Sequence, residues 1–316
     1  MFPNIPLKAR ALNAKLVKMW KDGFEQGSLG TSQIMDVCRI VGSDSDEVVY
    51  LFPQELRGMR TRANGTNELI PDAFNVYEAS VANKDRYRVL DVPLNDFKND
   101  KIGQFSGVAS MLGKAAASGP VIDAEELIAG GDVLATAPCY DGKALFATDH
   151  PTDPTKAGSA AWANKLVQAG GLTIDNFGVA LAAMSAFPSA TPGKAVGSRP
   201  SHLVVTSDYE GIGIDICTSR FPSGLAGAEN KWLGLGLELI VVPNWTARSM
   251  FCLFDARDTD ERAVVFQERE PMQLVPNGID PDGAFEYERG ALRWISKGMN
   301  GVGVGIPHKA LLSVKS

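Results

Sequence analysis

The sequence contains few of the residues that build disulfide frameworks or soft metal sites. Its 316 residues include only four cysteines and three histidines. The cysteines are far apart, form no CxxC pair, and no histidine lies at zinc-ligand spacing from another such ligand. We therefore expect no metal site and no other cofactor, and we expect reduced thiols in the compartment of synthesis.

Long apolar runs and an excess of basic residues are also lacking. No apolar stretch approaches the ~20 residues that a membrane-spanning helix needs, and the first residues lack the pattern of a signal peptide. The formal net charge of -6 and the pI of about 5.2 argue against a dedicated nucleic-acid-binding protein. We expect a soluble protein that does not interact with a membrane.

The hydrophobic share of 45% is typical of a folded protein, and the length allows one large domain or two smaller ones. Apolar residues in steps of three and four predict a helix over 7–24, whose other faces carry five basic residues. A second helix is predicted from Asn95 or Asp96 to Gly119-Pro120, and a third, capped by Thr173 or Asp175, ends at Pro188.

Buried strands are predicted in the second half of the chain. The apolar runs 203–206, 239–243 and 250–254 are typical of such strands, and the segment after Arg262 indicates strands alone. Together with the helices, these strands predict an α+β fold.

Residues 53–90 differ from the rest, because they offer little that would form a core. Turn signals at Asn64-Gly65 and Pro71-Asp72 interrupt a stretch of mixed charge. A long extension with weak internal burial must obtain its stability elsewhere. An arm that packs on a neighbouring subunit is one solution.

One catalytic alternative rests on Cys139 and His150, which could act as nucleophile and base in a cysteine hydrolase. No strand-to-helix elbow surrounds Cys139, and the segment Asp149-His150-Pro151 is more typical of a turn in which the aspartate binds local amides. We therefore expect no enzyme. Elimination favours a structural or assembly role.

Several segments resemble the Mu-like prophage major head subunit family. The most specific is CYDGKALFATDHP at 139–151. Segments 172–177, 199–205 and 237–243 are also similar, as is the end of the first helix at 24–27. In order and spacing the resemblance covers roughly residues 7–305.

The resemblance implies an α+β fold of the Hong-Kong-97 type found in phage capsids. Mapped onto this chain, it implies an N-terminal arm at 1–45, an extended loop at 46–92, a peripheral domain with a spine helix at 93–130, an axial domain at 131–255, and peripheral-domain strands at 256–316 whose last residues rejoin the axial domain.

The resemblance further implies a major capsid protein of a tailed phage or prophage. Copies would form hexamers and pentamers that close into an icosahedral shell around double-stranded DNA, enclosed without sequence specificity. Scaffolding protein, portal and decoration proteins would be further partners, and assembly in the bacterial cytoplasm would lead to the virion capsid. As residues for intersubunit ion pairs we predict Arg57, Arg60, Arg62, Arg86 and Arg88.

A cellular nanocompartment of the encapsulin type is the alternative within the same fold class. Such a shell encloses cargo enzymes in place of DNA, so the contents of the particle separate the two functions.

Overall fold

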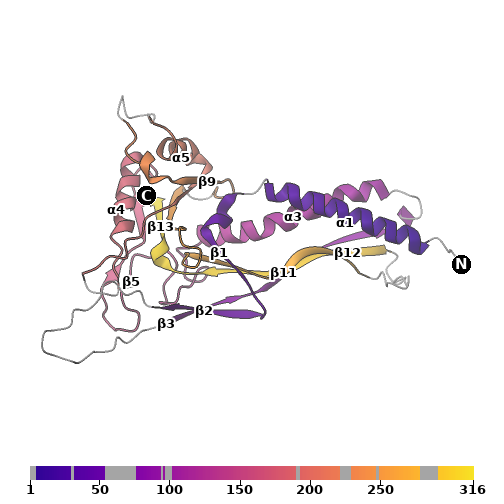
Figure 1. The fold of residues 1–316 in the computed structure, drawn as a ribbon, viewed down its shortest axis with the longest axis horizontal. Helices are drawn as coiled ribbons and strands as arrows, with labels where there is room; N and C mark the ends of the chain where they lie inside the picture. Colours follow the sequence, from indigo (N-terminus) through magenta and orange to yellow (C-terminus); the bar gives the residue numbers. More distant parts are fainter. Residues whose placement is uncertain are drawn as a thin grey trace.

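The computed structural model describes residues 5–29, 32–53, 76–93, 95–96, 102–189, 193–220, 229–246, 249–277 and 291–316. They form an L-shaped molecule with a long lobe, which contains α1 and α3, and a short lobe, which contains α4 and α5 (Figure 1). Among these residues, no helix is both long and apolar enough to cross a membrane.

The long lobe is built on a four-stranded sheet in the order β1-β11-β12-β4. β1 runs parallel to β11, and the other pairs are antiparallel. The strands are β1 (Cys38–Gly42), β4 (Lys84–Pro93), β11 (Val264–Asn277) and β12 (Ala291–Val304). Strands after Arg262 are confirmed within the described residues, with β12 as a single strand of 14 residues, but the expectation of strands alone is wrong, since Pro307–Lys309 form a 3-10 helix.

Helices α1 (Ile5–Leu29) and α3 (Ile102–Ala129) cover one face of this sheet (Figure 1). The predicted apolar stripe of the first helix is confirmed, since Leu12, Leu16 and Trp20 are buried in one cluster with Trp294. Trp20 also donates a hydrogen bond of 3.0 Å to the Ser296 hydroxyl. The N-terminal helix therefore packs on the body of its own chain.

The predicted end of the second helix at Gly119-Pro120 is wrong, because α3 continues through Pro120. Proline removes one backbone donor and normally ends or kinks a helix. Beyond it, Ala124 and Ile128 are fully buried in a cluster between the two lobes. This tertiary burial outweighs the local preference of the proline.

Glycines allow the backbones of α1 and α3 to touch. A Cβ atom added at Gly113 would overlap the carbonyl oxygen of Trp20, and one added at Gly23 would overlap that of Ser110. At Gly27 an added Cβ would lie 2.8 Å from the Cα of Lys114. The conformational cost of glycine in a helix is thus accepted for close packing.

A hairpin lies on the opposite face of the long sheet (Figure 1). It consists of β2 (Glu47–Pro53) and β3 (Val76–Ala82), which pair in antiparallel fashion. Tyr50, Phe52 and Val81 are buried against Val265 of β11. The residues of the expected extended loop that lie between 53 and 76 are outside the described residues, and β4 follows β3 into the long sheet.

The short lobe contains a five-stranded sheet in the order β7-β13-β10-β8-β9. The predicted buried strands are confirmed, and the C-terminal β13 lies inside this sheet. The elements of the short lobe are β5 (His150–Pro151), β6 (Ala161–Trp162), β7 (Lys165–Gln168), α4 (Ile174–Ser185), β8 (His202–Thr206), α5 (Glu210–Cys217), β9 (Glu238–Val242), β10 (Met250–Phe254) and β13 (Ala310–Lys315). β5 and β6 pair with each other in a separate two-stranded sheet. The predicted cap of α4 is also confirmed, since the Thr173 side chain accepts a hydrogen bond from the Asn176 amide.

Short 3-10 helices complete the described elements. They are η1 (Gln33–Val37), η2 (Ser207–Tyr209), η3 (Leu233–Leu235) and η5 (Pro307–Lys309). The last of these connects the long lobe to β13.

A buried carboxylate joins α3 to the short lobe. Glu125 is 2% exposed and accepts hydrogen bonds from the Ser32 hydroxyl and, at 2.6 Å, from the Asn244 side chain. The indole of Trp245 donates to the Glu125 carbonyl oxygen at 2.9 Å. A buried carboxylate needs such partners, so this site fixes the end of α3 against the short lobe.

A second buried polar group surrounds His150. Its Nδ1 lies 2.6 Å from the Asp141 carboxylate, and its Nε2 lies 3.1 Å from the side-chain oxygen of Asn164. The Asn164 amide donates in turn to the carbonyl oxygen of Pro307 at 3.1 Å. The expected turn at Asp149-His150-Pro151 is therefore wrong: His150 begins a short strand, and its ring is held by residues distant in sequence.

Aromatic stacking extends this group to His308. Trp162 lies between the rings of His150 and His308, with centroid separations of 4.8 and 4.0 Å. Burial and, to a smaller extent, the nearby His150 lower the pKa of His308 to about 4. His308 is thus neutral where it stacks on Trp162.

We expect Gly113→Ala to lower the free energy of unfolding by about 1–3 kcal/mol, because the added methyl group forces α1 away from α3. Gly107→Ala is the matched control on the same helix. No atom lies within 4 Å of a Cβ built there, so this change should raise stability by up to about 1 kcal/mol through helix propensity. Urea unfolding followed by circular dichroism measures both. Equal effects of the two substitutions would contradict the close-packing account.

We also expect stability to fall as the pH drops from about 6.5 to about 4. In this window the unfolded chain protonates His308 whereas the folded chain does not. His308→Phe keeps an aromatic ring beside Trp162 but cannot titrate. The free energy of unfolding of this variant should therefore fall less steeply with decreasing pH than that of the wild type. The two slopes should differ by up to ~1.4 kcal/mol per pH unit. Unfolding curves at several pH values test this, and parallel curves for the two proteins would refute it.

Candidate assembly surfaces

The hairpin carries apolar side chains on both of its faces. The inner face packs on the long sheet, whereas Val49, Leu51 and Val76 on the outer face are 53%, 60% and 52% exposed. Glu78 lies opposite Leu51 in the pairing register and adds charge to the outer face. Strands in which both faces are apolar are typically covered on both sides. The outer face is therefore a candidate contact surface.

A second uncovered surface lies on the distal part of the long sheet. Val89 of β4, Ile295 of β12 and Val275 of β11 are direct neighbours in the pairing register. Leu90 and Trp294, which alternate with them, face the helices, so the row Val89, Ile295 and Val275 points away from the helices. We call this row the distal row.

Exposure is uneven along the distal row, since Ile295 and Val275 are partly buried. Val89 is 42% exposed, and Tyr87 beside it is 69% exposed. On the other side the row is flanked by Arg293, which forms a bidentate ion pair with Asp91 at 2.6 Å. Apolar side chains bordered by charges are typical of surfaces that bind another protein.

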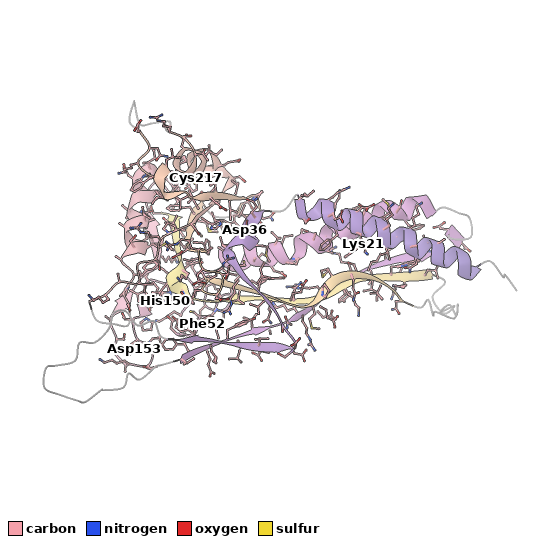
Figure 2. The ribbon with its side chains drawn as sticks, in the orientation of Figure 1. Lys21, Asp36, Phe52, His150, Asp153 and Cys217 are labelled. Atoms are coloured by element: carbon pink, nitrogen blue, oxygen red, sulfur yellow. The ribbon has the colours of Figure 1, made fainter. Side chains whose placement is uncertain are left out.

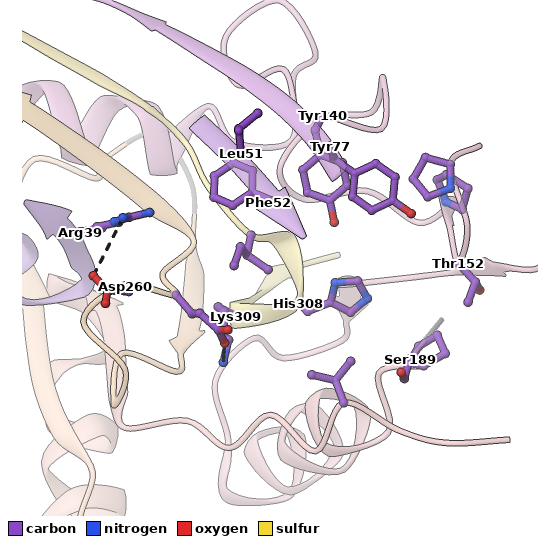
Figure 3. A pocket seen from close by; sticks show the side chains of 16 residues that line it. Arg39, Leu51, Phe52, Tyr77, Tyr140, Thr152, Ser189, Asp260, His308 and Lys309 are labelled. Carbon is purple, nitrogen blue, oxygen red and sulfur yellow. Dashed lines mark ion pairs between the residues drawn. The ribbon is translucent and has the colours of Figure 1, made fainter. Parts of the chain in front are cut away.

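A cavity of about 300 Å³ lies between the hairpin and the short lobe (Figure 3). The rings of Tyr77 and Tyr140 stack at 4.9 Å on one side of it. On the opposite side Lys309 pairs with Glu261 at 3.0 Å. The hairpin is thus anchored to the short lobe through aromatic rings, while Leu51 remains exposed at the rim.

The five arginines predicted to bind neighbouring subunits fall into three groups. Arg57, Arg60 and Arg62 lie outside the described residues. Arg86 forms an ion pair of 2.5 Å with Asp123 on α3 of its own chain. Arg88 is exposed and forms no ion pair with any residue of the described ranges.

Arg86 pairs internally because of the alternation along β4. The even positions of this strand face the helices, as the burial of Leu90 and Val92 shows. Burial raises the pKa of Asp123, while the Arg86 guanidinium acts in the opposite direction. The Arg86–Asp123 pair therefore ties β4 to α3 within one subunit.

The geometry does not support a cysteine nucleophile. Cys139 is 7% exposed, and burial together with the Asp141 carboxylate raises the pKa of its thiol. Activation of a cysteine requires the opposite shift. The His150 ring is engaged by Asp141 and Asn164. Among the described residues, no group of three or more potential metal ligands is present.

The sequence contains one pattern that indicates the outer face of the hairpin as a contact surface. Residues 48–52 form an uninterrupted apolar run, Val-Val-Tyr-Leu-Phe. Such a run indicates burial on both faces of a strand. The distal row offered no comparable signal, because its residues come from three segments that only the sheet brings together.

The sequence is similar to two curated head proteins. The major head subunit of the Mu-like prophage FluMu of Haemophilus influenzae is 28% identical over 147 residues, which are 46% of this chain and 44% of that protein. The major capsid protein of Escherichia phage Mu is 27% identical over 157 residues, 47% of each chain. The chain thus spans about half the length of the curated relatives that it matches.

The fold is also shared with a solved phage capsid. The procapsid protein of bacteriophage JBD30 has a TM-score of 0.51 at 16% identity, covering 97% of this chain and 76% of that one. The implied α+β fold of the Hong-Kong-97 type is therefore confirmed. The family model described as Mu-like prophage major head subunit gpT matches residues 10–172, just over half of the chain. The chain belongs to the Mu-like prophage major head subunit family.

Proposed function

We propose that the chain is a major capsid subunit that assembles into an icosahedral shell around double-stranded DNA. Copies form hexamers and pentamers, and the shell is the head of a tailed phage or Mu-like prophage. The observation that carries this proposal is the pair of uncovered apolar surfaces, the outer hairpin face and the distal row. Family membership and fold support it.

The uncovered surfaces fit contacts between copies. Full burial of an aliphatic side chain contributes ~1.5–3 kcal/mol relative to exposure, so covering Val49, Leu51 and Val89 stabilises a contact. The two surfaces differ, and a contact between different patches of identical subunits is head-to-tail, which forms a ring when the rotation between neighbours closes. A subunit held by several neighbours dissociates only when all contacts release together.

The roles of the chain segments are part of the proposal. The arm at 1–45, the extended loop at 46–92, the spine-helix segment at 93–130, the axial domain at 131–255 and the returning strands at 256–316 serve as the parts of a capsid subunit. Pairing of β13 in the short-lobe sheet supports a return of the last residues to the axial domain.

Ion pairs between subunits remain a proposal for Arg57, Arg60, Arg62 and Arg88. Arg86 would have to leave Asp123 before it could join a neighbour. Exposed pairs contribute only ~0–1 kcal/mol each. We therefore expect these arginines to select the geometry of a contact, whereas the apolar surfaces supply its strength.

Further partners follow from the same proposal. Scaffolding protein, portal and decoration proteins would act on the shell in the bacterial cytoplasm, and the finished shell would be the virion capsid. In a solved structure of bacteriophage JBD30, the capsid is decorated with minor capsid protein trimers. An encapsulin-type compartment would use the same fold, but the family match favours the phage head.

We predict that Leu51→Asp abolishes shell formation, because a carboxylate in the covered contact loses its hydration. Val89→Lys should act in the same way on the distal row. Leu51→Met and Val89→Ile are the matched controls, since they keep an apolar side chain at each position. Negative-stain microscopy and sedimentation of purified protein measure assembly.

Circular dichroism separates assembly from folding in this experiment. Both positions are exposed in the subunit, so the charged variants should keep the unfolding midpoint of the wild type. Normal shells from Leu51→Asp and Val89→Lys would contradict the proposed contacts. Particles that contain protein cargo in place of nuclease-protected DNA would favour the nanocompartment.

A further inference from the structure

Helix α1 is basic in a protein that is acidic overall. Residues 5–29 contain five basic and two acidic residues, whereas the whole chain has a net charge of -6. The basic residues are Lys8, Arg10, Lys15, Lys18 and Lys21. Positive charge is thus concentrated in one element.

The turn of the helix places three of these charges, Lys15, Lys18 and Lys21, on its outer side. Leu12, Leu16 and Trp20 are buried toward the sheet. At 3.6 residues per turn, Lys15, Lys18 and Lys21 fall outside that apolar arc. Lys15, Lys18 and Lys21 are exposed, and Figure 2 shows Lys21 on α1 in the helix layer of the long lobe.

The exposed lysines form no direct ion pair within the described residues. Lys15, Lys18 and Lys21 form no ion pair with a carboxylate of the described residues, although Asp22 and Glu25 share their helix. The lysines follow one another in steps of three, a spacing at which like charges repel across the helix surface. An external anion would relieve this repulsion.

We propose that the exposed face of α1 binds the phosphate backbone of double-stranded DNA. The binding would be independent of sequence, since lysine contacts to phosphate carry no base information. This inference rests on the proposed function, because it names the surface with which the shell subunit meets its contents. It assigns DNA binding to one helix, although the net negative charge of the whole chain disfavours such binding.

The dimensions of the basic face suit a duplex. From Lys15 to Lys21 the helix rises by ~9 Å. DNA carries one charge per ~1.7 Å of its axis, so a stretch of that length presents ~5 phosphates. Three exposed cations on one rigid helix therefore match a regular row of anions.

The basic face lies apart from the surfaces proposed for contacts between copies. α1 lies on the helix side of the long sheet, whereas the hairpin lies on the opposite side (Figure 1). The apolar surfaces proposed for contacts between copies are the outer hairpin face and the distal row, which points away from the helices. The basic face is thus left uncovered by those contacts.

The test compares two triple variants that remove the same charge. Lys15→Gln/Lys18→Gln/Lys21→Gln neutralises the basic face, and Lys156→Gln/Lys194→Gln/Lys315→Gln is the matched control. The control lysines are exposed and lie in the short lobe or its loops. Glutamine has nearly the same helix propensity as lysine, so circular dichroism should show equal helix content.

Affinity for a mixed-sequence duplex is measured with the unassembled full chain between about 50 mM and about 200 mM salt. Wild type and control should bind with the same salt dependence. In the α1 variant the slope of log K against log salt should be smaller in magnitude by up to about 3. Affinity at the lower salt should fall at least ~10-fold, which corresponds to about 1.4 kcal/mol.

Three results would overturn the inference. The α1 variant and the control could bind DNA equally well, both could weaken equally, or wild type could bind polyglutamate and not DNA. The last result would assign α1 to an acidic protein partner. Microscopy of the same variants keeps the questions separate: normal shells with unchanged DNA affinity would remove this inference alone, whereas absence of wild-type shells would remove the proposed function.

Discussion

Within the part of the chain that the structure describes, helices cover only one face of the long sheet, and this constraint shapes the rest of the molecule. α1 and α3 bury Leu90 and Trp294 on one side, and their glycine contacts allow two helices to share the narrow sheet. On the other side, within the described residues, the hairpin covers the part near the short lobe, where Val81 packs on Val265. Apolar surface of the described residues consequently remains exposed. Covering this surface with other copies is the physical basis of the assembly that we propose.

Local sequence patterns predicted the elements of this fold well. Features that depend on pairing between distant segments could not be predicted from them. The stripe of Leu12, Leu16 and Trp20 identified the first helix, because helical periodicity is a local property. The extension of α3 through Pro120 depends on burial of Ile128 between the lobes, which no local rule reports. The distal row combines Val89, Val275 and Ile295, and a one-residue shift in register would turn each of them to the helix side.

Charged and polar residues were harder to place than apolar ones for the same reason. Arg86 was expected at a subunit contact, yet its position in β4 directs it to Asp123 of the same chain. His150 was expected in a turn, yet its partners include Asn164, which is tied to Pro307 at the far end of the chain. A buried polar group must find partners wherever the fold supplies them. Sequence proximity is therefore a weak guide to its role.

The partial exposure of the apolar surfaces suits the reversible assembly that we propose. Val89 and Leu51 are 42% and 60% exposed, and charged groups such as Glu78 and the Asp91–Arg293 pair border them. A larger, purely apolar patch would bind any similar surface and lead to aggregation. Modest contacts let a wrongly placed subunit dissociate, because it lacks the full set of neighbours. In the proposed shell, a correctly placed subunit would be held by all of them at once, so the shell would be stable although each contact is weak.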